Sequence, residues 1–120
     1  MSAVADQIAE LEAQLKTVSA IGSAVHRNPG ASLALLPAVV IGPPILLWET
    51  GCPGPTEMRL ILYVVIDATD RALERLWDLV PAVADAADQT DAAVISASPG
   101  SFLSGATPLP AYEITIEVPL

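Results

Sequence analysis

The chain has 120 residues and a net charge of −9, and 52% of its residues are hydrophobic but only 16% are charged. Its five cations are too few and too scattered to form the basic patch that tight phosphate-backbone binding requires. With one cysteine and one histidine, an internal disulfide and the common zinc ligand sets are excluded, and the low charged fraction favours a subunit that buries surface in an oligomer.

The first segment predicts a helix over Ala3 to Ala24. A narrow apolar stripe recurs at spacings of four and three residues: Val4, Ile8, Leu11, Leu15 and Val18. Such a short stripe predicts docking on its own domain or on a neighbouring subunit in preference to a free coiled coil. The helix should stop at His26 to Gly30, because proline pushes the preceding residue out of the helical region. The segment is acidic and amphipathic, so no secretion signal is expected.

The next segment predicts two short strands, Ala38 to Ile41 and Ile45 to Glu49, separated by the bend at Gly42, Pro43 and Pro44. No residue from Asn28 to Trp48 is charged, and about 20 apolar residues can span a bilayer. The prolines interrupt this stretch and disfavour a helix. A buried strand pair or an interface segment is therefore preferred to a membrane span.

The central segment predicts a strand over Glu57 to Ile66. It follows a turn at Gly51 to Pro55, which suggests an antiparallel hairpin with the preceding strand. Its run MRLILYVVID, from Met58 to Asp67, is apolar without a break, so we expect protein on both faces of this strand.

The following segment predicts a helix over residues 70–88, with Asp67 or Thr69 capping its start. Pro81 lies inside it and should introduce a kink. One face of the predicted helix is apolar: Leu73, Leu76, Trp77, Val80, Ala84 and Ala87.

The last third predicts a strand at Ala92 to Ala97, a long polar and glycine-rich loop at Ser98 to Pro110, and an alternating strand at Ala111 to Val118. Together the segments predict one α+β domain over residues 1–120, in which residues 1–30 form the N-terminal helix and linker. Its mostly antiparallel sheet of about four or five strands is packed by that helix and the central helix.

Each reactive group has a simpler structural explanation. His26 beside a helix stop is expected to be solvated, and Cys52 to be a small turn residue. Asp67 and Asp70 fit a helix start better than an acid/base pair or a metal site. The loop SPGSFLSG lacks the lysine and the following helix of a phosphate-binding loop. The chain is therefore predicted to be no enzyme and to bind no cofactor or metal.

After the N-terminal helix, four segments follow in order: LPAVVIGPPILLWE, the strand and helix VVIDATDRALERLWDLVPAVADA, then DAAVISASPGSFLSG, and a closing LPAYEITIEVPL. In this order, the chain from about Leu36 onward resembles small neck and tail-terminator proteins of long-tailed bacteriophages, especially those of actinobacterial hosts. The shared features are packing and turn residues, and they include no catalytic signature.

The resemblance implies a small α/β subunit of the virion at the head–tail junction, assembled in the host cytoplasm. Its copies would form a ring, a hexamer, that stops polymerisation of the tail tube protein and joins the head-side connector or stopper protein. DNA would pass through the ring without specific binding, which agrees with the acidic balance. The alternatives are a head-closure or adaptor protein of the same neck and a non-viral α/β binding module.

Partner or oligomer contacts are expected in the glycine- and proline-rich connections and on the polar face of the last strand. The candidate residues are Pro43, Pro44, Pro53, Gly54, Pro99, Gly100, Ser101, Phe102, Leu103, Glu113 and Glu117.

Overall fold

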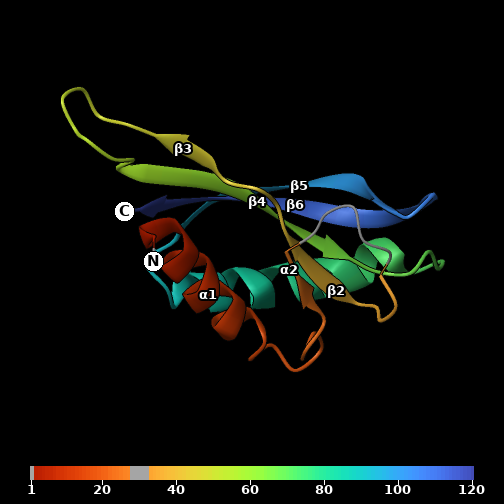
Figure 1. The fold of residues 1–120 in the computed structure, drawn as a ribbon. Coiled ribbons are helices and arrows are strands. Elements are labelled where there is room, and N and C mark those ends of the chain that lie inside the picture. The colour runs from red at the N-terminus through yellow and green to blue at the C-terminus, as the bar shows by residue number, and fades with distance from the viewer. Residues whose placement is uncertain (1, 28–32) are drawn as a thin grey trace.

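A computed structural model describes residues 2–27 and 33–120. Over these residues, two helices lie on one face of a six-stranded sheet (Figure 1). In chain order the elements are α1 (Ala3–Leu15), β1 (Val25–His26), β2 (Ala38–Ile41), β3 (Ile45–Leu47), β4 (Glu57–Val65), α2 (Ala72–Asp88), β5 (Ala93–Ser104) and β6 (Thr107–Pro119). The strand order is β1-β2-β4-β6-β5, with β3 also paired to β4, and only β1 and β2 pair in parallel. The mostly antiparallel α+β prediction is therefore confirmed, with more strands than expected.

The central strand is β4, which has β6 along one edge and β2 and β3 along the other. Its even-numbered residues from Met58 to Val64 are buried against the helices in the main core. On the opposite face, Arg59 is exposed and Ile61 and Tyr63 are half-buried. The prediction that both faces are covered is thus wrong over most of the strand, because both helices pack on the same face. We call the face that carries Arg59, Ile61 and Tyr63 the open face.

A bend separates β2 from β3, which follow one another along the same edge of β4. Gly42 donates its N–H to the carbonyl of Ile61 at 2.9 Å. A Cβ at Gly42 would lie 3.0 Å from that oxygen and 3.3 Å from Cε2 of Tyr63, so the close approach requires glycine. Pro43 and Pro44 have no N–H for the ladder, which is interrupted there. The predicted pair of short strands and the hairpin between β3 and β4 are confirmed, although β3 ends at Leu47 and not at the predicted Glu49.

The uncharged stretch from 28 to 48 is only partly a buried strand pair. β2 is buried throughout, whereas β3 is exposed to half-buried. Residues 28–32, which include part of the predicted helix stop, lie outside the described residues. Where the structure describes the chain, it contains no helix that is long and apolar enough to cross a membrane.

The N-terminal helix docks on its own domain, as its stripe predicts. Ser2 caps α1, since its hydroxyl oxygen accepts a hydrogen bond from the N–H of Ala5 at 3.0 Å. Leu11 and Leu15 are buried in the main core, and the rest of the predicted stripe packs at its margin.

The predicted continuation of this helix to Ala24 is wrong, because α1 ends at Leu15 and turns lead on to β1. The hydroxyl of Thr17 donates to the carbonyl of Gln14 at 2.6 Å, a local bond that competes with continued helix. Gly22, with φ 57°, adopts the left-handed conformation that helix ends favour.

The start of α2 differs from the prediction, although the helix does continue through Pro81. No side chain among the described residues caps it. The N–H of Ala72 donates to the backbone carbonyl of Thr69 at 3.1 Å, and the Asp67 carboxylate accepts from Arg75 at 3.2 Å. The helix begins too late for either predicted cap to reach its free amides.

The buried face of α2 is rotated relative to the prediction. Its buried residues are mostly small: Ala72, Leu76, Val83, Ala86 and Ala87. Leu73 and Trp77, expected in the core, are about half exposed. The Trp77 indole N–H donates to the Tyr112 hydroxyl at 2.9 Å, so this side chain reaches β6 instead of filling the core. The alanines explain the rotation, because they let the helix backbone approach the sheet closely.

The segment Ser98 to Pro110, predicted to be a loop, instead forms the distal half of a β-hairpin. β5 and β6 pair from Ala93 opposite Glu117 to Ser104 opposite Thr107, and Gly105 (φ 62°) lies in the turn. In Figure 1 the tip of the hairpin lies at the right-hand end of the sheet. We call its distal half, residues 99–110, the arm.

The prolines of the arm do not break the hairpin because their nitrogens point away from its ladder. The N–H of Ile66 donates to the carbonyl of Pro110 at 3.2 Å, so Pro110 faces the β4 side of β6. The backbone N and C=O groups of successive residues point alternately to the two edges of a strand. The nitrogen of Pro108, two residues earlier, therefore faces the β4 side as well. By the same rule Pro99, which lies opposite Tyr112, directs its nitrogen to the outer edge of β5.

A second, smaller core joins the arm to the open face. Its buried members are Val40, Val65, Phe102 and Ala111. The rings of Tyr63 and Phe102 are 5.5 Å apart between centroids. Leu33 and Leu36 pack against this cluster, and the N–H of Leu33 donates to the hydroxyl of Ser104 at 2.7 Å.

Glu12 on α1 links the stability of the fold to pH. Its carboxylate pairs with Lys16 at 3.2 Å and with Arg27. Burial raises the pKa of this carboxyl, but hydrogen bonds from Arg27 and Lys16 outweigh burial and hold the pKa below its ordinary value of 4.5. Because the folded pKa is depressed, the stabilisation is present above about pH 4.5 and is lost as the pH falls through the lowered pKa.

We therefore expect Glu12→Gln to lower the free energy of unfolding at pH 7 by about 0.5–1 kcal/mol, the range of partly exposed ion pairs. Urea unfolding at a series of pH values should show this difference narrowing below pH 4.5. Glu10→Gln removes the same charge from an exposed position on the same helix and is the control. A deficit that stays constant at acid pH would mean that Glu12 acts through packing instead of charge.

Candidate functional site

The arm carries no charged residue, although the chain as a whole is strongly acidic. The 21 residues from Ala92 to Tyr112 include no Asp, Glu, Lys or Arg, although the whole chain carries a net charge of −9. Most of the side chains on β5 are exposed. Uncharged exposed strand of this length is unusual, because proteins commonly place charges on edge strands to prevent pairing with other chains.

The two faces of the arm differ. Phe102, only 5% exposed, points into the second core on the open-face side. Leu103 and its partner Pro108 point to the opposite face by strand alternation, and Leu103 is 61% exposed. Phe102 was expected to be a contact residue, but its burial assigns it to packing, and Leu103 is the apolar side chain that the arm presents.

Pro99, Gly100 and Ser101 are exposed along β5, as expected for contact residues. A Cβ at Gly100 would collide with Oε2 of Glu113, so this glycine leaves room for that carboxylate to lie over β5. Glu113 and Glu117 lie on the open face of β6, half-buried.

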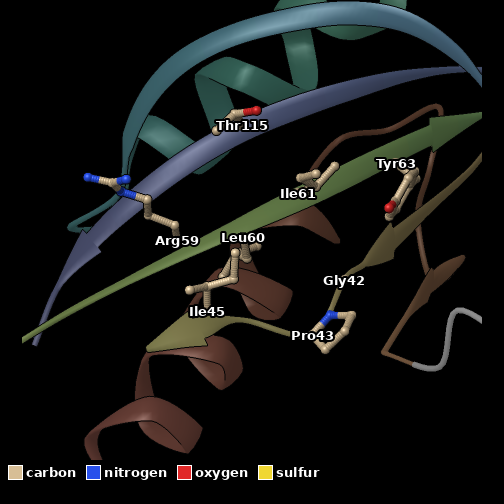
Figure 2. A pocket seen from close by; sticks show the side chains of 8 residues that line it. All are labelled: Gly42, Pro43, Ile45, Arg59, Leu60, Ile61, Tyr63 and Thr115. Carbon is tan, nitrogen blue, oxygen red and sulfur yellow. The ribbon is translucent and has the colours of Figure 1, made fainter. Parts of the chain in front are cut away.

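A shallow hollow of about 280 Å³ lies on the open face where the bend interrupts the ladder. Figure 2 shows its lining side chains, which come from the bend, β3, β4 and β6: Gly42, Pro43, Ile45, Arg59, Leu60, Ile61, Tyr63 and Thr115. Ile45 at its margin is 64% exposed. The hollow is therefore mostly apolar, and a partner's apolar side chain could fill it.

The rim of this hollow is charged. The Arg59 guanidinium lies 3.0 Å from the Glu117 carboxylate on the neighbouring strand β6 and 3.8 Å from the Glu57 carboxylate on its own strand. Two carboxylates thus surround one cation beside the apolar floor. An acidic partner surface would be repelled there, whereas a neutral one would not.

The other expected contact residues lie at the two ends of β3. Pro43 and Pro44 form the bend, and both also line a second hollow of about 280 Å³ that reaches α1. Pro53 and Gly54 lie in the turn between β3 and β4, as predicted, and this turn projects from the sheet in Figure 1. Trp48 at the start of that turn is 55% exposed.

The candidate reactive residues do not converge. His26 lies in β1, half-buried, so the prediction that it is a solvated residue at a helix stop is wrong. Its Nε2 is buried without a hydrogen-bond partner among the described residues. Cys52 is exposed in the turn, as expected, and Asp67 pairs with Arg75. Over residues 2–27 and 33–120, no three acidic, cysteine or histidine side chains group in a way that could hold a metal ion.

Sequence reasoning missed the hollow and the exposed face of the arm. Arg59 within an apolar strand is a signal that one face of β4 meets solvent. The 21 uncharged residues are a second signal, visible once they are compared with the charge of the whole chain.

Comparison with protein-family models, curated proteins and solved structures found no match to this chain.

Proposed function

We propose that this chain is an assembly subunit of the neck of a long-tailed bacteriophage, a tail terminator whose copies close into a hexameric ring. In this role it acts by contact, not catalysis. The ring caps the tail tube, stops its polymerisation and joins it to the head-side connector.

The observation that carries the proposal is the distribution of charge. An acidic chain with one long uncharged arm has a surface on which copies can meet without repulsion, while the rest of its exterior repels phosphate. A channel through which DNA slides benefits from that repulsion, since binding would slow passage. The resemblance of the segments after Leu36 to neck proteins supports the choice of the neck as the place of the assembly.

Removing the chain from the particle tests this role. A terminator must match the tail tube on one face and refuse further tube subunits on the other. Without it, tails should become overlong and variable in length and remain detached from filled heads. Electron microscopy measures both properties, and wild-type chain supplied in trans is the control.

Tails of normal, uniform length that remain detached would rule out the terminator role. That result would support a head-closure or adaptor protein, because the tails would still carry their own cap while heads leak or fail to join. Normal particles made without the chain would favour a binding module unrelated to the neck.

A further inference from the structure

We infer that the arm of one copy docks on the open face of the next, with Leu103 inserted into the hollow beside Ile45. This inference deepens the proposed function, on which it rests for closure of the ring. It names the two surfaces that meet and the residue at the centre of each.

The first step is that the chain leaves two apolar surfaces uncovered on opposite sides of its sheet. The helices cover one face, yet Leu103 on that side of the arm is 61% exposed. The opposite face is covered at the arm by the second core but is open around Ile45 and Ile61. Leu103 thus lies beyond the region that the helices cover, and the hollow lies beyond the region that the second core covers.

The second step is that the two surfaces differ in shape. The arm presents a projecting leucine, and the open face presents a hollow of about 280 Å³, several times the ~30 Å³ that one water molecule takes in the liquid. A projection on one copy and a hollow on the next make a head-to-tail contact. Contacts of this kind generate rings when the rotation closes.

The third step identifies the occupant as a second copy. Arg59, Glu57 and Glu117 lie on this face, and the chain as a whole repels other copies of itself through its net charge of −9. The arm carries no charge, so it can approach this face without adding a like charge. A basic foreign protein would instead be attracted to the acidic surface generally and would not need Leu103.

The test uses one variant on each surface of the full chain. Leu103→Asp places a carboxylate on the arm, and Ile45→Asp places one at the hollow. Both residues are more than 60% exposed, so folding should be retained, which thermal unfolding checks. Leu73→Asp is the control, because it makes the same charge change at an exposed leucine on α2. Leu103→Ser and Ile45→Ser repeat the test without added charge.

Analytical ultracentrifugation up to about 1 mM protein should show concentration-dependent association of the wild-type chain and of Leu73→Asp. Each aspartate variant should raise the dissociation constant tenfold or more, because a buried, unpaired carboxylate is costly. Mixing the two variants in equal amounts should restore association but stop it at dimers. In such a dimer the intact arm of one chain meets the intact hollow of the other, and no further pairing is possible.

Several results would overturn the contact: a wild-type chain that stays monomeric to about 1 mM, association of Leu103→Asp or Ile45→Asp as tight as wild type, or a mixture that stays monomeric. None of these results would affect the test of the terminator role, which is the length of tails made without the chain. Conversely, uniform detached tails would end the terminator proposal and leave this contact standing.

Discussion

Truncating Leu62 to alanine should lower the free energy of unfolding by roughly 2–5 kcal/mol. Leu62 is fully buried on the helix side of β4, opposite Ile114 of β6 and Ile41 of β2. The cavity would therefore open in the middle of the sheet, where neighbouring strands on both edges limit collapse. Since small domains have about 5–15 kcal/mol in total, this one change should remove a large part of the stability. Urea or thermal unfolding measures the loss.

The neighbouring residue on the same strand is the matched control. Ile61 points to the open face and is half-buried, so Ile61→Ala should cost distinctly less than Leu62→Ala. Equal losses at the two positions would contradict the assignment of one covered and one open face to β4. Equal losses would also remove the free hollow that the proposed contact needs.

The sequence was sufficient to predict the elements that its apolar pattern defines. The run from Met58 onward identified the central strand, and the stripe through Leu11 and Leu15 identified the docked first helix. Turn chemistry placed the bend at Gly42 and the turn before β4. Each of these signals is local, so one sequence contains it.

The wrong predictions concern features that tertiary contacts determine. Whether one or both faces of β4 are covered depends on where two distant helices pack, which periodicity does not record. Small residues form the buried face of α2, so Trp77 lies outside the core and donates a hydrogen bond to Tyr112. Proline and glycine content suggested a loop at 98–110, but the direction of each proline nitrogen is known only once the pairing register is fixed.

The candidate site was predicted in part. The arm and the bend were both expected to reach partners, and the structure exposes side chains at both. The individual residues were harder to choose, because Phe102 and Leu103 are adjacent and apolar and differ only in the face on which they lie. The hollow is assembled from the bend, the consecutive strands β3 and β4, and the distant strand β6, so no single segment signals it.

Phe102→Ala should destabilise the arm strongly, by up to roughly 3–5 kcal/mol if the second core cannot collapse around the gap. Its ring contacts Tyr63 and is buried among Val40, Val65 and Ala111, so this single side chain ties the arm to β4 and β2. A two-stranded hairpin without such packing is marginal in water. Amide hydrogen exchange should show loss of protection first in the residues of the arm.

Leu103→Ala, one residue further along, should change stability by no more than about 0.5 kcal/mol, because its side chain is mostly exposed. The pair therefore separates two ways of losing association. Phe102→Ala should weaken association because it disorders the arm. Leu103→Ala should weaken association because it removes the docking side chain, while the arm stays ordered. If Phe102→Ala left both stability and exchange unchanged, residues 98–110 would behave as the loop that their composition first suggested, and a rigid arm presenting Leu103 to a neighbouring copy would lose its physical basis.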